Sequence, residues 1–387
     1  MSEESLNVLK RAFREYYFQR DAIEIPTRIE EREFGYLPFG GFMTRHLKLK
    51  NKGELTALLV RESPRGVYAS CSYYEDPSLP MTEKGWKSGD LAFDIDCDDL
   101  EMECKKDHDR WTCKGCLLVG RGIRPARCPS CANTKILTLN WSCKLCLDAS
   151  KDEIIKLKEI LLKDFGMTRG KISTFFSGNK GYHLTVENSE FDALDQRGRG
   201  ELANYISGKG LDIAKLGLSK NADYNNMVSR LPVLGEPGWR GKIASFFDDY
   251  EFEGERDDGD IKSKIANYYG KLSPKKFGAI IDLAIRSRGA KIDSVVTIDI
   301  HRIFRLAGSL HEKTGLSKKR CDDLNSFDPT TDPVEIKDEP IKVRVSMSPP
   351  FTLRERTYGP YKSEEVILPL HAGVYLMGNN LAQAVNS

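Results

Sequence analysis

The chain has 387 residues, of which 40% are hydrophobic and 30% charged, a composition typical of a globular protein. It contains no apolar run near the roughly 20 residues that a membrane-spanning helix needs, and its N-terminus lacks the layout of a signal peptide, so we predict a cytoplasmic protein without membrane contact. The net charge of +2 is not that of a protein coated in nucleic acid, but residues 104–146 and 286–320 are rich in Lys and Arg.

The N-terminal part predicts a helix followed by strands. Apolar and aromatic residues recur on one face of a helix over residues 5–20. Aromatic alternation around a Gly-Gly break predicts strand, turn and strand over 31–49, and a further strand is expected over 66–72. Gly89-Asp90 is expected to turn the chain into the next strand.

Further along, the pattern predicts a helix, a hairpin, a helical region and a last strand. The helix is expected to begin at Ser150, with Glu153 at the capping-box position. KISTFFSGNKGYHLTV, from Lys171, predicts strand, glycine-flanked turn and strand. Residues 190–290 are polar and weakly patterned, which predicts a mostly helical insertion, and the apolar run from Val295 predicts a strand.

The stretch LAFDIDCDDL places acidic side chains inside an apolar strand. Because side chains alternate along a strand, Asp94 and Asp96 share one face while Phe93 and Ile95 share the other. Two adjacent carboxylates repel each other, and a divalent cation such as Mg²⁺ or Mn²⁺ relieves that repulsion and prefers oxygen ligands. The alternative is a solvent-facing acidic row on a half-buried strand.

The turn SGNKGYH, residues 177–183, combines glycines with polar side chains. Its glycines allow the backbone to approach a ligand closely, and Ser177 and Lys180 can donate to phosphate oxygens. His183 starts the following strand and is expected on the same face as Ser177. The alternative is an ordinary hairpin with a structural histidine.

A third acid, Asp299, lies near the end of the apolar run and is followed by Arg302, Arg305, His311 and Lys313. One more carboxylate would complete a two-metal site, and the cations can bind the negative charge of a triphosphate. The alternative is an ordinary acidic cap at the end of a strand.

These three segments together resemble a known family. FDID, SGNKGYH and the Asp299 segment ending in SLHEKTG occur in the order and spacing of the small catalytic subunit of archaeal and eukaryotic DNA primases. The N-terminal EREFG and the C-terminal LPLHAGVYL also look like that family. The resemblance spans most of the chain and is weakest over residues 190–290.

The resemblance implies an α/β (α+β) fold, namely a primase–polymerase catalytic core around a mixed sheet, with an inserted zinc-binding module and a mostly helical insertion. The core would comprise residues 1–96, 149–189 and 291–387. The zinc-binding module would span residues 97–148, and the helical insertion residues 190–290.

The resemblance also assigns site residues. Asp94, Asp96 and Asp299 would carry two Mg²⁺ or Mn²⁺ ions. The phosphates of the incoming nucleotide would be held by the remaining candidates, which are Arg32, Ser177, Lys180, His183, Arg305 and Lys313.

The ten cysteines indicate structural zinc rather than disulfides. Two Cys-x-x-Cys pairs eleven residues apart can close one tetrahedral site, formed by Cys113, Cys116, Cys128 and Cys131. A third pair needs two further ligands, and the nearest candidates complete a second set of Cys104, His108, Cys143 and Cys146. Related primases have one zinc site in this region, so the first set would be an addition. An alternative pairs 113/116 with 143/146 and leaves 128/131 unpaired.

The sequence therefore predicts a template-directed nucleotidyltransferase that makes short RNA, or DNA, primers on single-stranded DNA from nucleoside triphosphates. The resemblance implies a large primase subunit as its partner in a heterodimer. Three alternatives remain open: a repair-type primase–polymerase that extends existing ends, a catalytically inactive zinc-ribbon subunit that binds nucleic acid, and a metal-dependent glycosyltransferase.

Overall fold

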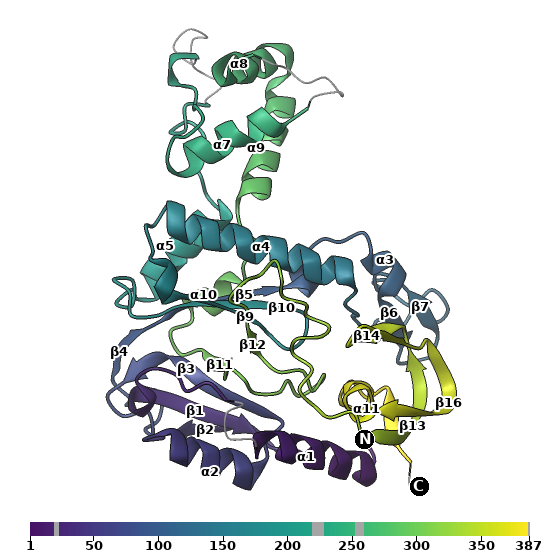
Figure 1. Ribbon diagram of the computed structural model, residues 1–387. Coiled ribbons are helices and arrows are strands. Elements are labelled where there is room, and N and C mark those ends of the chain that lie inside the picture. Colours follow the sequence, from purple (N-terminus) through teal and green to yellow (C-terminus); the bar gives the residue numbers. More distant parts are fainter. Residues whose placement is uncertain (19–22, 219–227, 252–258, 386–387) are drawn as a thin grey trace.

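The computed structural model describes residues 1–18, 23–218, 228–251 and 259–385. It places two antiparallel sheets face to face, with helices on their outer sides and a helical part projecting from one end (Figure 1). The α/β class expected from the sequence is confirmed, but the expected mixed sheet is wrong, because every strand pair among the described residues is antiparallel. None of the described helices is both long and apolar enough to cross a membrane.

The first sheet has the order β11-β3-β1-β2, with β4 also paired to β3. Its strands are β1 (Arg32–Leu37), β2 (Thr44–Leu47), β3 (Gly66–Tyr74), β4 (Trp86–Gly89) and β11 (Ile303–Arg305). Two helices lie along its outer side, namely α1 (Glu3–Tyr17) and α2 (Lys52–Glu62) (Figure 1). The strands and turn predicted for this part of the chain are confirmed, and β4 is an addition. The helix predicted over residues 5–20 is α1, which ends at Tyr17, and residues 19 and 20 of that prediction lie outside the described residues.

The second sheet has the order β12-β9-β10-β5. Its strands are β5 (Leu91–Asp96), β9 (Ile172–Phe176), β10 (Gly181–Val186) and β12 (Lys319–Arg320). It is covered by α4 (Lys144–Lys163), which contacts β5 and β10, while α10 (Ser294–Ile298) lies between β5 and α5 (Gln196–Ser207). The predicted hairpin at residues 171–186 is confirmed. Short 3-10 turns precede or follow these elements at Ile29–Glu31, Cys97–Asp99 and Arg169–Lys171.

The helical part has a hydrophobic core of its own. It contains α7 (Gly238–Asp249), α8 (Ile261–Lys271) and α9 (Pro274–Arg288), which pack around Phe247, Ile265 and Phe277. By contrast, α5 packs on the main core through Leu202 and Ile206. The second core therefore begins after α5, and α9 returns the chain to the main body (Figure 1).

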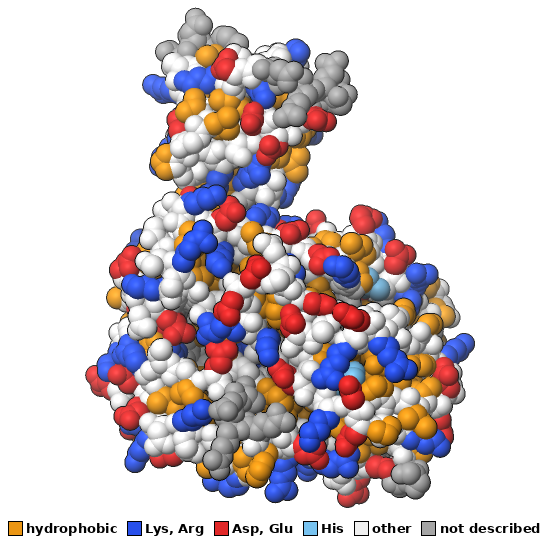
Figure 2. Space-filling model, in the orientation of Figure 1, with side chains coloured by type: hydrophobic (Ala, Val, Ile, Leu, Met, Phe, Trp, Pro, Cys, Tyr) orange, Lys and Arg blue, Asp and Glu red, His pale blue; other side chains and the backbone are white. Residues whose placement is uncertain are grey.

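Two peripheral units complete the fold. The cysteine segment forms α3 (Lys105–His108), β6 (Arg110–Cys113), β7 (Val119–Arg121) and β8 (Ile136–Leu139). The C-terminal part forms β13 (Pro340–Ser348), β14 (Phe351–Leu353), β15 (Arg356–Tyr358), β16 (Tyr361–Pro369), α11 (Leu370–Gly378) and β17 (Ala382–Ala384). Helix α11 packs against α1 and β13 and so ties the C-terminal part to the main core. Acidic and basic side chains are interspersed over the face seen in Figure 2, in keeping with the small net charge.

Two predictions of local structure are wrong. The helix expected to begin at Ser150 begins at Lys144, and the Ser150 hydroxyl donates within the helix to the Cys146 carbonyl. Glu153 does not cap the helix, because its carboxylate accepts a hydrogen bond from the Lys291 backbone at 2.8 Å. The two cysteines of the first turn, rather than a capping box, determine where this helix starts.

The apolar run from Val295 is helix α10 rather than a strand, and the strand β11 begins only at Ile303. The Asp293 side chain caps the helix by accepting from the Val295 backbone N–H at 2.9 Å. Packing of α10 between β5 and α5 overrides the strand preference of its β-branched residues.

Candidate active site

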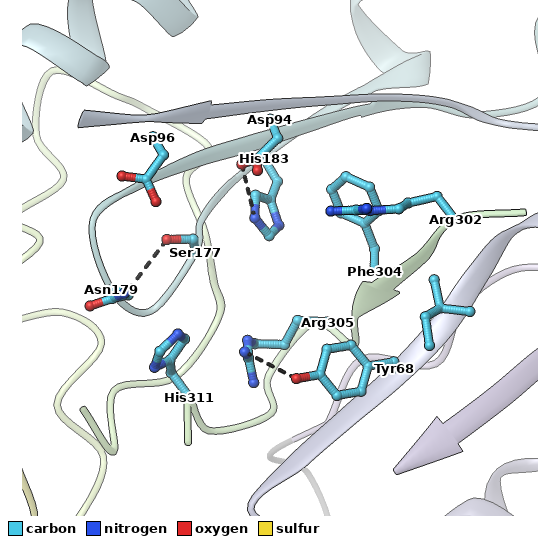
Figure 3. A pocket seen from close by; sticks show the side chains of 11 residues that line it. Tyr68, Asp94, Asp96, Ser177, Asn179, His183, Arg302, Phe304, Arg305 and His311 are labelled. Carbon is cyan, nitrogen blue, oxygen red and sulfur yellow. Dashed lines mark hydrogen bonds and ion pairs between the residues drawn. The ribbon is translucent and has the colours of Figure 1, made fainter. Parts of the chain in front are cut away.

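A cavity of about 170 Å³ lies between the two sheets, where the predicted acidic and histidine motifs meet (Figure 3). The second sheet and its turn contribute Asp94, Asp96, Ser177, Asn179 and His183. The first sheet and the segment after β11 contribute Tyr68, Arg302, Ile303, Phe304, Arg305 and His311. Motifs more than 80 residues apart in sequence are thus brought together because β5 and β10 are neighbours.

The register of β5 and β10 positions the central groups. Asp94 lies opposite His183, and Asp96 lies opposite Gly181. A side chain at Gly181 would place its Cβ 1.9 Å from the Ile95 carbonyl oxygen, so only glycine allows this close pairing. The tight turn therefore holds the histidine beside the aspartate.

Asp94 and Asp96 both have raised pKa values, so their ionised forms are less favourable than that of an exposed carboxylate. Burial raises the pKa of Asp94 to about 7, and the charges of Asp96 and Asp293 add to that rise. Burial also raises the pKa of Asp96, while the Asp98 backbone N–H, which donates to it at 2.9 Å, opposes the rise. A divalent cation would remove this repulsion, and carboxylate oxygens are its preferred ligands.

His183 is buried as a neutral imidazole. Its Nε2 lies 3.3 Å from an Asp94 carboxylate oxygen, and Phe304 packs against its ring edge to face at 4.8 Å. Burial, followed by the charges of Lys318 and Arg305, holds the pKa of His183 well below its ordinary value. Its Nδ1 is buried without a hydrogen-bond partner in the described structure.

The turn between β9 and β10 presents polar groups to the cavity. The Ser177 hydroxyl accepts hydrogen bonds from the backbone N–H groups of Asn179 and Gly181, each at 3.3 Å. Gly178 has a positive φ of 84°, and its carbonyl accepts from the Thr314 hydroxyl at 2.5 Å. This last bond joins the turn that carries Ser177 to the HEKTG segment that carries Lys313.

Arg305 supplies a fixed positive charge on the opposite wall. Its guanidinium pairs with Glu312 at 2.6 Å, donates to the Leu310 carbonyl at 3.1 Å and lies over the Tyr68 ring. Arg302 and His311 line the same cavity, as Figure 3 shows. The predicted cation-rich segment after Asp299 therefore faces the aspartates.

Lys318, which the sequence did not single out, is a further buried cation near this cavity. Its ammonium donates to the Arg305 carbonyl at 2.8 Å and lies near the Phe175 and Phe304 rings. Burial lowers the pKa of Lys318 to about 8. A lysine in the sequence KKR is more often a surface residue, so no sequence signal distinguished it. Tyr68 was likewise found only by the structure.

Four of the candidates do not line the cavity. Arg32 forms a buried ion pair with Asp90 at 2.6 Å and donates to Tyr73 and to the Ser70 carbonyl. Lys180 pairs with Asp98 at 2.8 Å and donates to the Asn140 carbonyl. These contacts favour a structural role for both side chains.

The other two are Asp299 and Lys313. The Asp299 carboxylate accepts a hydrogen bond from the His301 backbone N–H at 2.9 Å, beyond the end of α10. The backbone N–H of Lys313 donates to His311 Nδ1 at 3.1 Å, which orients that imidazole. The acid whose charge acts on Asp94, after Asp96, is instead Asp293, whose backbone N–H donates to the Asp94 carbonyl.

The cysteine segment contains two clusters that could each hold a zinc ion. In each cluster the ligand atoms lie within 4.8 Å of one another, and the members are Cys104, His108, Cys143 and Cys146 in the first, and Cys113, Cys116, Cys128 and Cys131 in the second. Both sets are those preferred from the sequence, and the alternative that joins 113/116 to 143/146 is wrong. Asp109 contacts His108 Nδ1 at 2.8 Å and so orients the ligating ring, as is common at zinc sites.

Paired carboxylates facing a neutral histidine, a serine turn and the buried Arg305 are the kinds of groups that could hold a divalent metal and bind phosphates. Comparison with known proteins agrees with this class. Residues 139–322 match the family model for the DNA primase small subunit. The chain is 38% identical to the DNA primase small subunit PriS of Nitrosopumilus maritimus and 37% identical to that of Cenarchaeum symbiosum, over 99% of this chain and at least 99% of each relative. It is 30% identical to PriS of Archaeoglobus fulgidus over 95% of this chain and 96% of the relative.

The chain therefore belongs to the DNA primase small subunit family.

Proposed function

We propose that this chain is the catalytic subunit of a DNA primase, a nucleotidyltransferase that makes short RNA primers on single-stranded DNA from nucleoside triphosphates. The observation that carries the proposal is the β5–β10 register, which places His183 beside Asp94 in a cavity shared with Ser177 and Arg305. Family membership supports the same activity.

Asp94 and Asp96 are the proposed ligands of the catalytic Mg²⁺ or Mn²⁺. Asp299, the third ligand expected from the sequence, does not line the cavity, and Asp293, whose charge acts on Asp94, is the proposed third ligand in its place. Metal bound there would lower the pKa of the attacking 3′-hydroxyl and neutralise the triphosphate. The high pKa of Asp94 supports this assignment, because two buried neighbouring carboxylates need a cation to be ionised together.

The side chains around the metal site would bind and orient the incoming triphosphate. His183 lines the cavity beside Asp94, and the Ser177 turn offers a hydroxyl. Arg305 and Arg302 lie across the cavity, where they would stabilise the charge of the departing pyrophosphate. The O3′–P bond to the α-phosphorus forms, the bond to the bridging oxygen breaks, and pyrophosphate leaves with that electron pair while the hydroxyl proton passes to solvent.

The proposal includes structural zinc and a partner. Each cluster has four protein ligands and therefore no open position for catalysis, so we assign one structural Zn²⁺ to each. A large primase subunit in a heterodimer and a cytoplasmic location remain parts of the proposal, and they are supported by family membership alone.

A primer-synthesis assay tests the proposal. The purified chain is incubated with single-stranded DNA, Mg²⁺ or Mn²⁺ and labelled nucleotides, with and without an added primer, and the products are resolved by size. Short products that require template and metal are expected. Extension of an added primer without any synthesis in its absence would instead favour a polymerase that leaves initiation to its partner. No synthesis under any condition, even with a large subunit present, would refute the enzymatic function.

A further inference from the structure

A second cavity, of about 260 Å³, lies next to the first and shares one residue with it. The shared residue is Asp96. The other lining residues are Ile95, Asp99, Ser207, Arg286, Gly289, Ala290, Lys291, Ile292 and Asp293. Apart from β5 and its acidic end, these residues belong to the end of α5, the end of α9 and the segment that joins α9 to α10. A ligand in this second cavity would therefore approach Asp96 from a different direction than a ligand in the first.

Two cations of this cavity are not engaged by the protein. Within residues 1–18, 23–218, 228–251 and 259–385, neither the Arg286 guanidinium nor the Lys291 ammonium forms an ion pair or a hydrogen bond. Both side chains are exposed. This contrasts with Lys180 and Arg305, which are paired with Asp98 and Glu312. The second cavity therefore has two charges available for an anion.

The backbone that carries these cations is held firmly in place. The Lys291 N–H donates to Glu153 at 2.8 Å, and the Ala290 N–H donates to the Ile206 carbonyl at 3.1 Å. The Asp293 N–H donates to the Asp94 carbonyl at 2.9 Å, which joins the segment to the edge of β5. Hydrogen bonds to α4, α5 and β5 thus hold the backbone at Lys291 close to the strand that carries Asp94 and Asp96, while Arg286 is carried by the last turn of α9.

Acidic side chains limit what the second cavity can take. Asp99 and Asp293 line it together with Asp96, so its three acids outnumber its two cations in the absence of a bound metal. The Asp293 carboxylate is already used as the cap of α10. A single phosphate group that contacts Arg286 and Lys291 suits this balance better than a whole triphosphate with its own metal.

We propose that the second cavity binds a phosphate of the nucleotide that carries the attacking 3′-hydroxyl, through Arg286 and Lys291. This inference rests on the proposed function. In an in-line displacement the attacking oxygen and the departing pyrophosphate lie on opposite sides of the α-phosphorus. The first cavity, with Ser177, His183 and Arg305, takes the triphosphate, so the attacking nucleotide reaches the metal site from the other side of Asp96.

The phosphate can come from two sources. It is the 3′-terminal phosphodiester when a primer is extended, and the 5′-phosphate of the first nucleotide when a primer is started. Both present the same chemistry to Arg286 and Lys291, and separate assays of extension and of initiation distinguish them.

The test uses the full chain with Arg286→Ala and Lys291→Ala combined. Lys275→Ala with Lys276→Ala is the matched control, because it removes two exposed cations from the first turn of α9, roughly 16 Å away along the same helix. Steady-state rates are measured against the concentration of primed template, of unprimed template and of incoming nucleotide, each at several salt concentrations. Arg286→Lys with Lys291→Arg preserves the charge and tests for rescue.

The expected result is a rise of about tenfold in the KM for primed template, for initiation, or for both. The slope of log KM against log salt should fall by about 1 for each phosphate that the variant no longer neutralises, while the KM of the incoming nucleotide stays at the wild-type value. The lysine control should match wild type, and the charge-preserving variant should recover most of the affinity. An effect on extension alone identifies the phosphodiester, and an effect on initiation alone identifies the first nucleotide.

Two results would overturn the inference while leaving the proposed function intact. One is a wild-type KM for template and for initiation in the alanine variant. The other is a rise in the KM of the incoming nucleotide alone, which would place the two cations at the triphosphate. A wild-type chain that makes no product would instead refute the proposed function, and this inference with it.

Discussion

The two cysteine clusters have the same kind of ligands but very different connections to the rest of the molecule. In the first cluster Cys146 is buried and Cys143 caps α4, the helix that packs on β5 and β10. Cys97, the residue after Asp96, lies 3.5 Å from the hydroxyl of Ser142 beside this cluster. The first cluster is thus joined to the strand that carries Asp94 and Asp96.

The second cluster is peripheral. Cys116 and Cys131 are exposed, and so are apolar neighbours such as Leu117 and Ile123. Its ribbon of β6, β7 and β8 forms a small separate sheet. Two clusters with the same ligand chemistry can therefore differ in their effect on activity. Among the described residues, only the first cluster contacts the end of β5, so we expect only its loss to shift Asp94 and Asp96.

The largest effect on the rate of primer synthesis is expected from substitutions in β5. Asp94→Asn combined with Asp96→Asn should lower the rate of primer synthesis by a factor on the order of 10³ or more, because the metal ligands are removed. The measurement is the initial rate with saturating template and nucleotides. Asp98→Asn is the matched control, since Asp98 is an acid of the same segment that pairs with Lys180. An equal loss in the control would mean that the whole acidic segment, rather than the aspartate pair, is required.

The next effect concerns Lys318, a buried cation whose charge acts on Asp94. Its pKa is lowered to about 8 by burial, whereas the unfolded chain keeps an ordinary lysine pKa of about 10.5. Between these values the unfolded state binds a proton that the folded state has released, so stability rises with pH over this range. The free energy of unfolding of wild type, relative to Lys318→Met, should rise by up to about 3 kcal/mol from pH 7 to pH 10.5.

Denaturant unfolding across that pH range measures this difference. Lys319→Met is the control, because the neighbouring Lys319 has a side chain that is 44% exposed and pairs with Glu335. A difference between wild type and Lys318→Met that does not change with pH would show that Lys318 is charged and well solvated in the folded protein.

Asp293 and Asp299 are compared next, because the sequence indicated Asp299 as the third metal ligand whereas the charge of Asp293 acts on Asp94. Asp293→Asn should slow synthesis about 10²-fold through loss of one metal ligand, while the amide can still cap α10. Asp299→Asn, which changes an acid that does not line the cavity, should change the rate less than about threefold. Rates as a function of Mn²⁺ concentration separate the two. The reverse order of effects would assign the third metal position to Asp299.

The substitutions that we expect to change the rate least are those in the two cysteine clusters. Cys143→Ser with Cys146→Ser should lower the rate about tenfold and the Tm by roughly 5 °C, because the start of α4 loses its support. Cys116→Ser with Cys131→Ser should change the rate less than about twofold. Zinc content, rate and Tm are measured on each variant, and each should lose one zinc ion. A larger loss of activity in the second variant would show that the ribbon takes part in synthesis.

Much of the candidate site could be predicted from the sequence. Alternation along a strand placed Asp94 and Asp96 on one face, and the glycine-flanked turn placed Ser177 and His183 at the same end of a hairpin. The cysteine spacings likewise led to both ligand sets. These predictions succeeded because each depends on residues that are close together in the chain, where the geometry of a strand, a turn or a knuckle leaves few choices.

The roles of side chains that contact residues far away in the chain were decided by the tertiary structure alone. Asp90, which lies 58 residues away, engages Arg32, and Asp98, 82 residues away, engages Lys180. Packing between β5 and α5 made a helix of a segment whose residues favour a strand, and burial between two sheets turned Lys318 into a lysine of low pKa. Local pattern thus determined which residues could do the chemistry. The long-range contacts, which no local pattern contains, decided which of them face the cavity.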